Sequence, residues 1–292
     1  MNNSKTYDYI IIGGGSAGSV LAARLAEQAD LKICLIEAGS RDETPRIQTP
    51  AGTITLYKSK KFSWNFYSTP QKSLGGRQIH VPRGKALGGS SSMNSMIYIR
   101  GLPSDYDRWE QQGCEGWGWN NVLPWFKRSE KNLLSQDPAY HGFNGELLVD
   151  KPRDPNPVSA LFVAAGKRVG LAENTDFNGK SLAGVGIYNV TQKDGKRLSC
   201  YRAFLHPHIG RSNLTVMTDC TVQTLIIEDK AVKGVRITEH GRDQPTSILC
   251  RHEVILSAGS IGSPHILLKS GIGPAAELEA AGIPLVHPLP GV

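Results

Sequence analysis

The stretch "IIIGGGSAGSVLAARL" (residues 10–25) places a glycine cluster between an apolar run and a segment whose apolar residues recur at helical spacing. Residues 7–12 are predicted to form a buried strand, and residues 16–28 an amphipathic helix. Gly13, Gly15 and Gly18 form the pattern G-x-G-x-x-G at the junction. Such a turn lets the main chain approach a pyrophosphate and directs the free N–H groups of the helix toward it.

A second predicted strand, "KICLIEAG" (residues 32–39), completes a strand–helix–strand unit. Glu37 lies near its end, 19 residues after Gly18. A carboxylate at this place accepts hydrogen bonds from ribose hydroxyls and would repel a 2′-phosphate. The unit therefore predicts a Rossmann-like nucleotide site, but the pattern alone does not distinguish NAD from FAD.

The composition argues against several other classes of protein. The net charge is +7, yet the basic residues are dispersed, and the densest cluster is "KSKK" at residues 58–61. We interpret this cluster as a solvated loop, expect no nucleic-acid partner, and keep contact with an anionic membrane surface as the alternative. The five cysteines are scattered without C-x-x-C spacing, which argues against a disulfide framework and a zinc site.

The sequence contains no apolar run of the length that spans a bilayer, and no secretory leader is visible at its N-terminus. The predicted location is therefore the cytoplasm. Peripheral contact with the cytoplasmic face of the membrane is the alternative.

A second cluster of small residues occurs in "PRGKALGGSSSMNSMIYIRG" (residues 82–101). Five consecutive glycine and serine residues, 88–92, are followed closely by the apolar "MIYI". A flexible loop is one interpretation. The mixture favours a cofactor wall, in which main-chain N–H groups face phosphates or ring edges and apolar side chains lie behind them.

With these segments the sequence resembles the glucose–methanol–choline (GMC) oxidoreductase family, flavoproteins that oxidise alcohols. The first family signature is matched by "GKALGGSSSMN" (residues 84–94), and the second by "GSIGSP" (residues 259–264) with "SGIG" (residues 270–273). The stretches "HGFNGELLV" and "RAFLHP" make the chain similar to the choline dehydrogenase-like branch, which includes medium-chain aliphatic alcohol dehydrogenases. The resemblance covers nearly the whole chain and implies that the nucleotide is FAD.

The resemblance also implies which residues hold FAD. By position they are Gly13, Gly15, Ser16, Ala17 and Gly18 for the pyrophosphate, Glu37 and Ala38 for the ribose, Leu87, Gly88, Gly89, Ser90, Asn94, Ser95, Met96 and Ile97 for the flavin, and Val222, Ala258 and Gly259 for the adenosine half. Some relatives have a histidine before the asparagine of the first signature, and it bonds covalently to the flavin. Met93 stands there in this chain, so we expect noncovalent FAD.

The fold class that the resemblance implies is α/β: a Rossmann-like FAD-binding domain with a parallel sheet and helices, plus an incomplete α+β substrate domain. We expect residues 1–150 to form the first part of the FAD-binding domain, residues 151–212 part of the substrate domain, and residues 213–292 the second part of the FAD-binding domain. The implied reaction moves a hydride from the carbon of a primary alcohol, either choline or a medium-chain aliphatic alcohol, to flavin N5. The electron acceptor is not indicated.

The family's catalytic histidine, with a second histidine or an asparagine, comes from a segment near the end of a chain nearly twice this length. None of the eight histidines matches it, so we expect the catalytic residues beyond Val292 and little or no turnover from this half-length chain. His265 is interpreted as a packing residue on a helix face, and the pair His206 and His208 as a polar loop in preference to a metal site. The alternatives are a non-catalytic FAD-binding remnant and an NAD-dependent dehydrogenase.

Overall fold

The computed structural model describes residues 5–242 and 244–292, which form two compact units. Unit 1 comprises Met1–Ile47, Gly52–Met93 and Ser199–Val292, and unit 2 comprises Gln48–Ala51 and Asn94–Leu198. The expected domain boundaries at residues 150 and 212 stay a prediction, because the two units are defined by compactness and not by what each of them binds.

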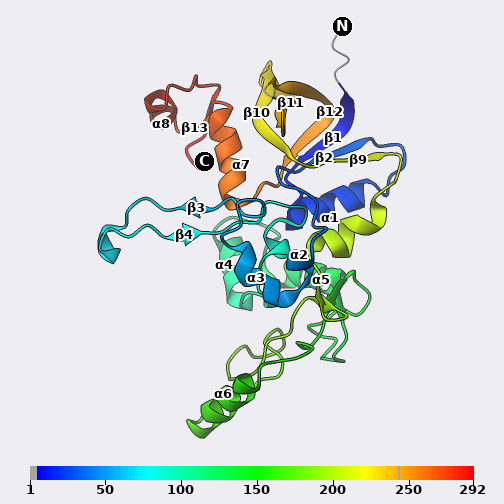
Figure 1. The fold of residues 1–292 in the computed structure, drawn as a ribbon, viewed down its shortest axis with the longest axis vertical. Helices are drawn as coiled ribbons and strands as arrows, with labels where there is room; N and C mark the ends of the chain where they lie inside the picture. Colours follow the sequence, from blue (N-terminus) through cyan, green and yellow to red (C-terminus); the bar gives the residue numbers. More distant parts are fainter. Residues whose placement is uncertain (1–4, 243) are drawn as a thin grey trace. The chain divides into compact units, whose positions relative to one another are not determined.

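Unit 1 is built on a six-stranded sheet with the strand order β10-β11-β12-β1-β2-β9 (Figure 1). Strand β1 pairs in parallel with β12 and β2, and β2 pairs in parallel with β9, whereas β11 is antiparallel to both of its neighbours. The mixed α/β class with a mostly parallel sheet is therefore confirmed. The strands are β1 (Thr6–Ile12), β2 (Ile33–Ile36), β9 (Leu214–Met217), β10 (Cys220–Glu228), β11 (Ala231–Glu239) and β12 (Thr246–Leu256).

Strand β2 and the last three residues of β1 are wholly apolar because both faces of the sheet are covered there. Ile10 and Ile12 of β1 belong to one buried cluster, and Ile11 belongs to another on the opposite face. Helix α1 (Ser16–Leu25) and the short π-helix η4 (Tyr201–Leu205) supply Ala22 and Tyr201 to the second cluster, while α7 (Gly259–Lys269) supplies Ile266 to the first. Alternation along β1 between two covered faces therefore explains why the strand ends in a continuous apolar run, residues 10–12.

Helix α1 packs so closely on β1 that position 18 admits no side chain. A Cβ atom at Gly18 would lie 1.9 Å from the carbonyl oxygen of Gly13 and 2.7 Å from Oγ of Ser257. The hydroxyl of Ser257 donates to the carbonyl oxygens of Ile12 and Gly13, so the ends of β1 and β12 are joined at the same point. This close packing fixes where the first turn of the helix begins.

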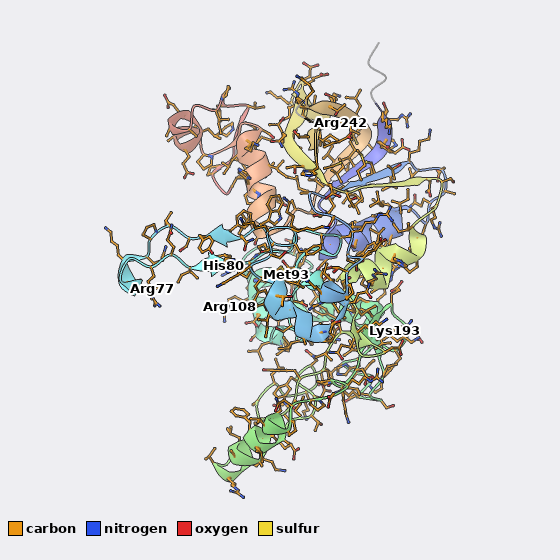
Figure 2. All side chains as sticks on the ribbon, viewed as in Figure 1. Arg77, His80, Met93, Arg108, Lys193 and Arg242 are labelled. Carbon is orange, nitrogen blue, oxygen red and sulfur yellow. The ribbon has the colours of Figure 1, made fainter. Side chains whose placement is uncertain are left out.

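Unit 1 also contains a set of short elements, many of them between residues 40 and 103, where the sequence shows little regular periodicity. They are α2 (Pro45–Gln48), α3 (Thr53–Leu56), β3 (Phe66–Tyr67), η2 (Lys72–Leu74), β4 (His80–Val81), η3 (Gly89–Ser92), η5 (His206–His208), β13 (Ile272–Gly273), α8 (Ala275–Ala280) and β14 (His287–Pro288). Strands β3 and β4 pair in an antiparallel arm that carries Arg77 and His80 (Figure 2). The Nε2 atom of His80 lies 3.0 Å from Oδ1 of Asn65.

Unit 2 contains helices α4 (Pro103–Gln111), α5 (Trp119–Ser129) and α6 (Pro157–Arg168), with strands β5 (Glu130–Asn132), β6 (Leu147–Val149), β7 (Gln192–Lys193) and β8 (Lys196–Arg197). Helix η1 (Pro50–Gly52) lies where the chain passes between the units. No helix in the described ranges is both long and apolar enough to cross a membrane.

Two local expectations from the sequence are wrong in unit 2: Ser104 as the N-cap of a short helix that ends at Gly113, and a strand at residues 184–192. The N-cap of α4 is Leu102 and not Ser104, because Oδ2 of Asp105 accepts the main-chain N–H of Leu102 and fixes an earlier start of the helix. Of the expected strand 184–192, only Gln192 belongs to a strand. Val185 and Val190 form only isolated bridges, Val185 with Glu173 and Val190 with Ile97 and Asp150, so these residues make single tertiary contacts and no ladder.

We predict that Gly18→Ala destabilises the protein by about 1–3 kcal/mol, because the new methyl group meets main-chain atoms that cannot move aside. The free energy of unfolding from urea titration measures this effect. The control is Gly291→Ala, where no atom lies within 4 Å of the added Cβ. Equal stability of Gly18→Ala and the control would show that the helix is not held against β1 in this way.

Candidate cofactor-binding site

Unit 1 contains a cavity of about 570 Å³ at one edge of its sheet. The last residues of three parallel strands, Ile12 of β1, Ile36 of β2 and Leu256 of β12, line this cavity. Ligands of open α/β sheets bind outside the carboxyl ends of the strands, and ligand sites span about 300–1,000 Å³. Both the position and the size of the cavity are therefore typical of a nucleotide site.

The two glycine segments meet at this cavity although they are far apart in the chain. The main-chain N–H of Gly88 donates to the carbonyl oxygen of Gly14 at 2.7 Å. A Cβ atom added to Gly89 would lie 2.8 Å from Cα of Gly15, and both residues line the cavity. A side chain at position 89 would push the two turns apart, so their direct contact depends on Gly89 being glycine.

Two helix N-termini also border the cavity. Helix α1 begins after Gly15 and helix α7 begins after Ala258, and in neither helix does an N-cap side chain accept a first-turn N–H or an acidic residue occupy the first turn. First-turn N–H groups have no partner within a helix, and the helix dipole places partial positive charge there. The two N-termini therefore favour a ligand that carries phosphate groups.

Side-chain charge in the cavity favours the same kind of ligand. Arg83, His265 and Lys269 line it, and among its described lining residues Glu37 alone is acidic. His265 was expected to be a packing residue, but it is exposed on α7 and faces the cavity, so that interpretation is wrong. The charges of Arg83 and Lys269 suit a pyrophosphate, whereas the carboxyl group of Glu37 needs a hydrogen-bond donor from another part of the ligand.

Glu37 is buried at the end of β2, and both of its oxygens accept main-chain N–H groups. Oε2 accepts from Gly14 and Oε1 accepts from Gly39, each at 2.8 Å. Loss of water around the carboxylate raises the pKa of Glu37 to about 7, although these two hydrogen bonds act in the opposite direction. Because each oxygen has two lone pairs, each can accept one further hydrogen bond from a ligand hydroxyl.

The structure places the expected cofactor residues in three groups. Most of them line the cavity: Gly13, Gly15, Ser16, Ala17, Glu37, Ala38, Gly89, Ser90, Val222, Ala258 and Gly259. Gly18, Leu87 and Gly88 belong to the same unit but lie behind the lining residues, where they set the packing of the turns. The remaining four, Asn94, Ser95, Met96 and Ile97, belong to unit 2.

Several lining residues were not expected from the sequence. They are Ile12, Ile36, Trp64, Phe66, Arg83, Gly84, Cys220, Thr221, Leu256, Ser257, Ser260, Ile261, Gly262, Ser263, His265, Ile266 and Lys269. Those around Gly259 continue the second signature along α7, so its helical spacing was an available signal. Trp64 and Phe66 were candidates for a substrate pocket because of their aromatic rings, and Arg83 comes from a segment without periodicity, so nothing in the sequence placed these three at the cofactor cavity.

The aromatic pair Trp64 and Phe66 forms part of the cavity wall. Their rings are stacked with centroids 5.8 Å apart and an angle of 4° between the planes. Nζ of Lys85 lies 4.7 Å from the centroid of the Trp64 ring, in the geometry of a cation–π contact. This stack gives the cavity a rigid flat surface that suits a planar ring or an apolar chain.

Met93, at the position of the covalent histidine of some relatives, lies in unit 1 (Figure 2). Its side chain is buried in a cluster with Ile47, Leu56, Phe62 and Ala86. The thioether therefore packs among apolar side chains and has no ionisable group to offer a ligand.

Comparison with known proteins gives consistent results. The profile of a protein family described as GMC oxidoreductase matches residues 7–289. An alcohol dehydrogenase [acceptor] of Pseudomonas putida is 47% identical over 286 residues, which are 98% of this chain and 52% of the relative. An oxygen-dependent choline dehydrogenase of Photobacterium profundum is 43% identical over 289 residues, covering 98% of this chain and 50% of the relative.

Solved structures resemble the chain in the same way. Pyridoxine 4-oxidase from Mesorbium loti superposes with a TM-score of 0.92 at 35% identity, over 98% of this chain and 56% of that protein. An FAD-dependent oxidoreductase from Chaetomium thermophilum superposes with a TM-score of 0.90 at 31% identity, over 98% of this chain and 51% of that protein. The chain thus spans about half the length of the relatives it matches.

The raised pKa of Glu37 predicts a pH dependence of stability. The folded protein releases the Glu37 proton near pH 7, but the unfolded chain releases it near its ordinary value of 4.5. The carboxyl group therefore contributes stability that is fully present below about pH 4.5 and is lost as the pH rises through about 7. We expect the free energy of unfolding of the unmutated protein, relative to Glu37→Gln, to fall over this window in denaturant titrations. A constant difference between the two would contradict the burial of this carboxyl group.

Proposed function

Because the chain belongs to the GMC oxidoreductase family, we propose that residues 1–292 bind FAD noncovalently within a flavin-dependent oxidoreductase that acts on the CH–OH group of primary alcohols. The family and an FAD-dependent structural neighbour imply FAD as the cofactor. The observation that carries the proposal is the contact between the Gly15 and Gly89 turns at a cavity bordered by two helix N-termini.

The cavity residues fit the adenosine and pyrophosphate parts of FAD. The turn at Gly13 and Gly15 and the N-terminus of α7 at Gly259 would bind the pyrophosphate through main-chain N–H groups. The free lone pairs of Glu37 would accept the two ribose hydroxyls. Val222, near the start of β10, lies on the cavity wall and would contact the adenine.

The flavin ring would be held by residues 87–90, at the second glycine cluster, and by residues 94–97, which follow it. When bound, FAD supplies the electron acceptor of the reaction, since flavin N5 takes the hydride from the alcohol carbon. The chain's own contribution is to bind and orient the cofactor and to exclude water around it. Met93 would leave the flavin without a covalent bond, because its buried thioether cannot replace the histidine found in some relatives.

The substrate class follows from the relatives and is part of the proposal. One is described as an alcohol dehydrogenase and another as a choline dehydrogenase. The stacked rings of Trp64 and Phe66 suit either a quaternary ammonium group or an alkyl chain. A medium-chain primary alcohol and choline are therefore both kept as substrates.

Two other functions are separated by one spectroscopic measurement. An NAD-dependent dehydrogenase would need only the first glycine turn, whereas here the second turn contacts the first. A non-catalytic FAD-binding protein would share the cofactor site but not the reaction. A visible flavin absorbance band in the purified protein excludes the first alternative, and reduction of that band by an alcohol excludes the second.

We predict that the protein binds FAD and releases it intact on acid precipitation. Gly15→Val should weaken binding on the order of 100-fold, because Gly15 lines the cavity and a branched side chain there would occupy the proposed phosphate path. Titration of the apoprotein with FAD, followed by flavin fluorescence, measures the dissociation constant. Gly291→Val, at a position with open space around it, is the control and should bind as the unmutated protein does. Unchanged binding by Gly15→Val would remove the basis of the proposal.

We expect residues 1–292 by themselves to turn over at least about 10²-fold more slowly than full-length relatives, the usual contribution of one general acid–base group. The reason is that none of the eight histidines matches the family's proton-transferring position. The rate of dye reduction by FAD-loaded protein with 1-octanol or choline checks this expectation. A rate equal to that of the relatives would show that a residue within this chain performs the proton transfer.

A further inference from the structure

Unit 2 contains a buried ionic network that the proposed cofactor site does not use. At its centre is Arg100, which is 6% exposed. Its Nη2 atom donates to Oε2 of Glu130 at 2.8 Å, and its Nη1 atom donates to the carbonyl oxygen of Tyr140 at 2.6 Å. The guanidinium also lies over the rings of Tyr98 and Phe126, with distances to the ring centroids of 5.6 and 5.2 Å.

His141 extends the network from Glu130 to a second carboxylate. Its Nδ1 atom lies 2.9 Å from Oε1 of Glu130, and its Nε2 atom lies 3.0 Å from Oδ2 of Asp176. Burial acts to lower the pKa of His141, but the hydrogen bonds to Asp176 and Glu130 outweigh it and raise the pKa to about 9. The network then holds two cations, Arg100 and His141, and two carboxylates, so its charges balance within the buried group.

Asn178 connects this network to the segment that begins at Asn94. Its main-chain N–H donates to Oδ1 of Asp176 at 3.0 Å. Its side-chain Oδ1 accepts the N–H of Arg100 at 2.8 Å, and its Nδ2 donates to the carbonyl oxygen of Tyr98 at 2.9 Å. The side chain of Asn178 thus fixes the main chain at Tyr98 and at Arg100, directly after the segment 94–97.

The segment itself is held in a conformation that needs external support. Met96 has a φ of 62°, in the left-handed region that non-glycine residues rarely adopt. The N–H of Met96 donates to Oδ1 of Asn94 at 3.0 Å, and its carbonyl oxygen accepts the N–H of Thr191 at 2.9 Å. Nη1 of the buried Arg197 donates to Oδ1 of Asn94 at 2.9 Å, so a second arginine binds the segment at its other end.

We propose that Arg100 and Glu130 are positioning residues, which with His141 and Asp176 hold the segment from Asn94 to Ile97 in the backbone conformation that binds the flavin ring. This inference rests on the proposed function, which assigns that segment to the flavin. The two residues act through Asn178 and the main chain of Tyr98, and we assign them no contact with the substrate.

The chemistry of the network explains why it is ionic. Buried ion pairs add little stability over an apolar replacement of the same shape, so stability alone does not account for the buried Arg100, Glu130 and His141 with the partly buried Asp176. A guanidinium donates along fixed directions in one plane, and an apolar side chain has no such directions. The network therefore specifies one backbone geometry next to a strained residue.

The test compares Arg100→Met and Arg100→Lys with the unmutated protein in two measurements. Amide hydrogen exchange in the absence of FAD reports whether Met96, Tyr98 and Arg100 stay protected. The visible circular dichroism of bound FAD and its midpoint potential report on the surroundings of the flavin. Both quantities would stay unchanged if Arg100 only stabilised a part of unit 2 that does not contact the flavin. Lys167→Met, which removes an exposed ion pair with Glu173 in the same unit, is the control.

We expect the three amides of Arg100→Met to exchange at least about 10-fold faster while those of β1 keep their protection. The flavin dichroism should change in Arg100→Met, recover partly in Arg100→Lys and stay unchanged in the control.

If Arg100→Met does not fold, Asp176→Asn weakens the same network more gently and should show the same pattern. Unchanged amide exchange or unchanged flavin dichroism in the variants overturns the inference. Absence of FAD binding in the unmutated protein instead overturns the proposed function, and the amide exchange then still reports whether the network holds the segment.

Discussion

The cofactor site depends on direct contact between two stretches of main chain that carry no side chains. Gly15 and Gly89 approach so closely that a single methyl group on Gly89 would lie 2.8 Å from Cα of Gly15. Behind this contact, Gly18 lets α1 lie against the end of β1. Main-chain atoms cannot rearrange as side chains can. The close main-chain contacts at these glycines therefore determine the shape of the cavity.

The charges around the cavity then determine which kind of ligand it favours. Two helix N-termini and the side chains of Arg83 and Lys269 provide positive charge, while Glu37 is the one acidic side chain among the described lining residues. A ligand with a pyrophosphate and a ribose diol satisfies both parts at once. The buried carboxylate also disfavours an additional phosphate on that ribose, since two negative charges would then share a site from which water is excluded.

The second unit uses charge differently. In unit 1 charge faces a cavity, whereas in unit 2 Arg100, Glu130, His141 and Asp176 neutralise one another inside the protein. A group of this kind is sensitive to the loss of any member, because the partner left behind is buried without compensation. Its four charged residues come from four separated places in the chain, which ties the geometry of residues 94–100 to the folding of the whole unit.

The sequence by itself determined the strand–turn–helix unit, the mostly parallel sheet, the two glycine turns and the acid after β2. These features are encoded locally, since apolar spacing, glycine and chain order act over a few residues. Tertiary structure alone decided that Arg83, His265 and Lys269 share the cavity with Trp64, that Glu37 is buried deeply enough to shift its pKa, and that His141 meets Asp176. It also overrode the expected strand at residues 184–192, whose hydrogen bonds go to distant segments. Each of these features depends on contacts between residues that are far apart in the sequence. The local spacing of residue types does not predict such contacts.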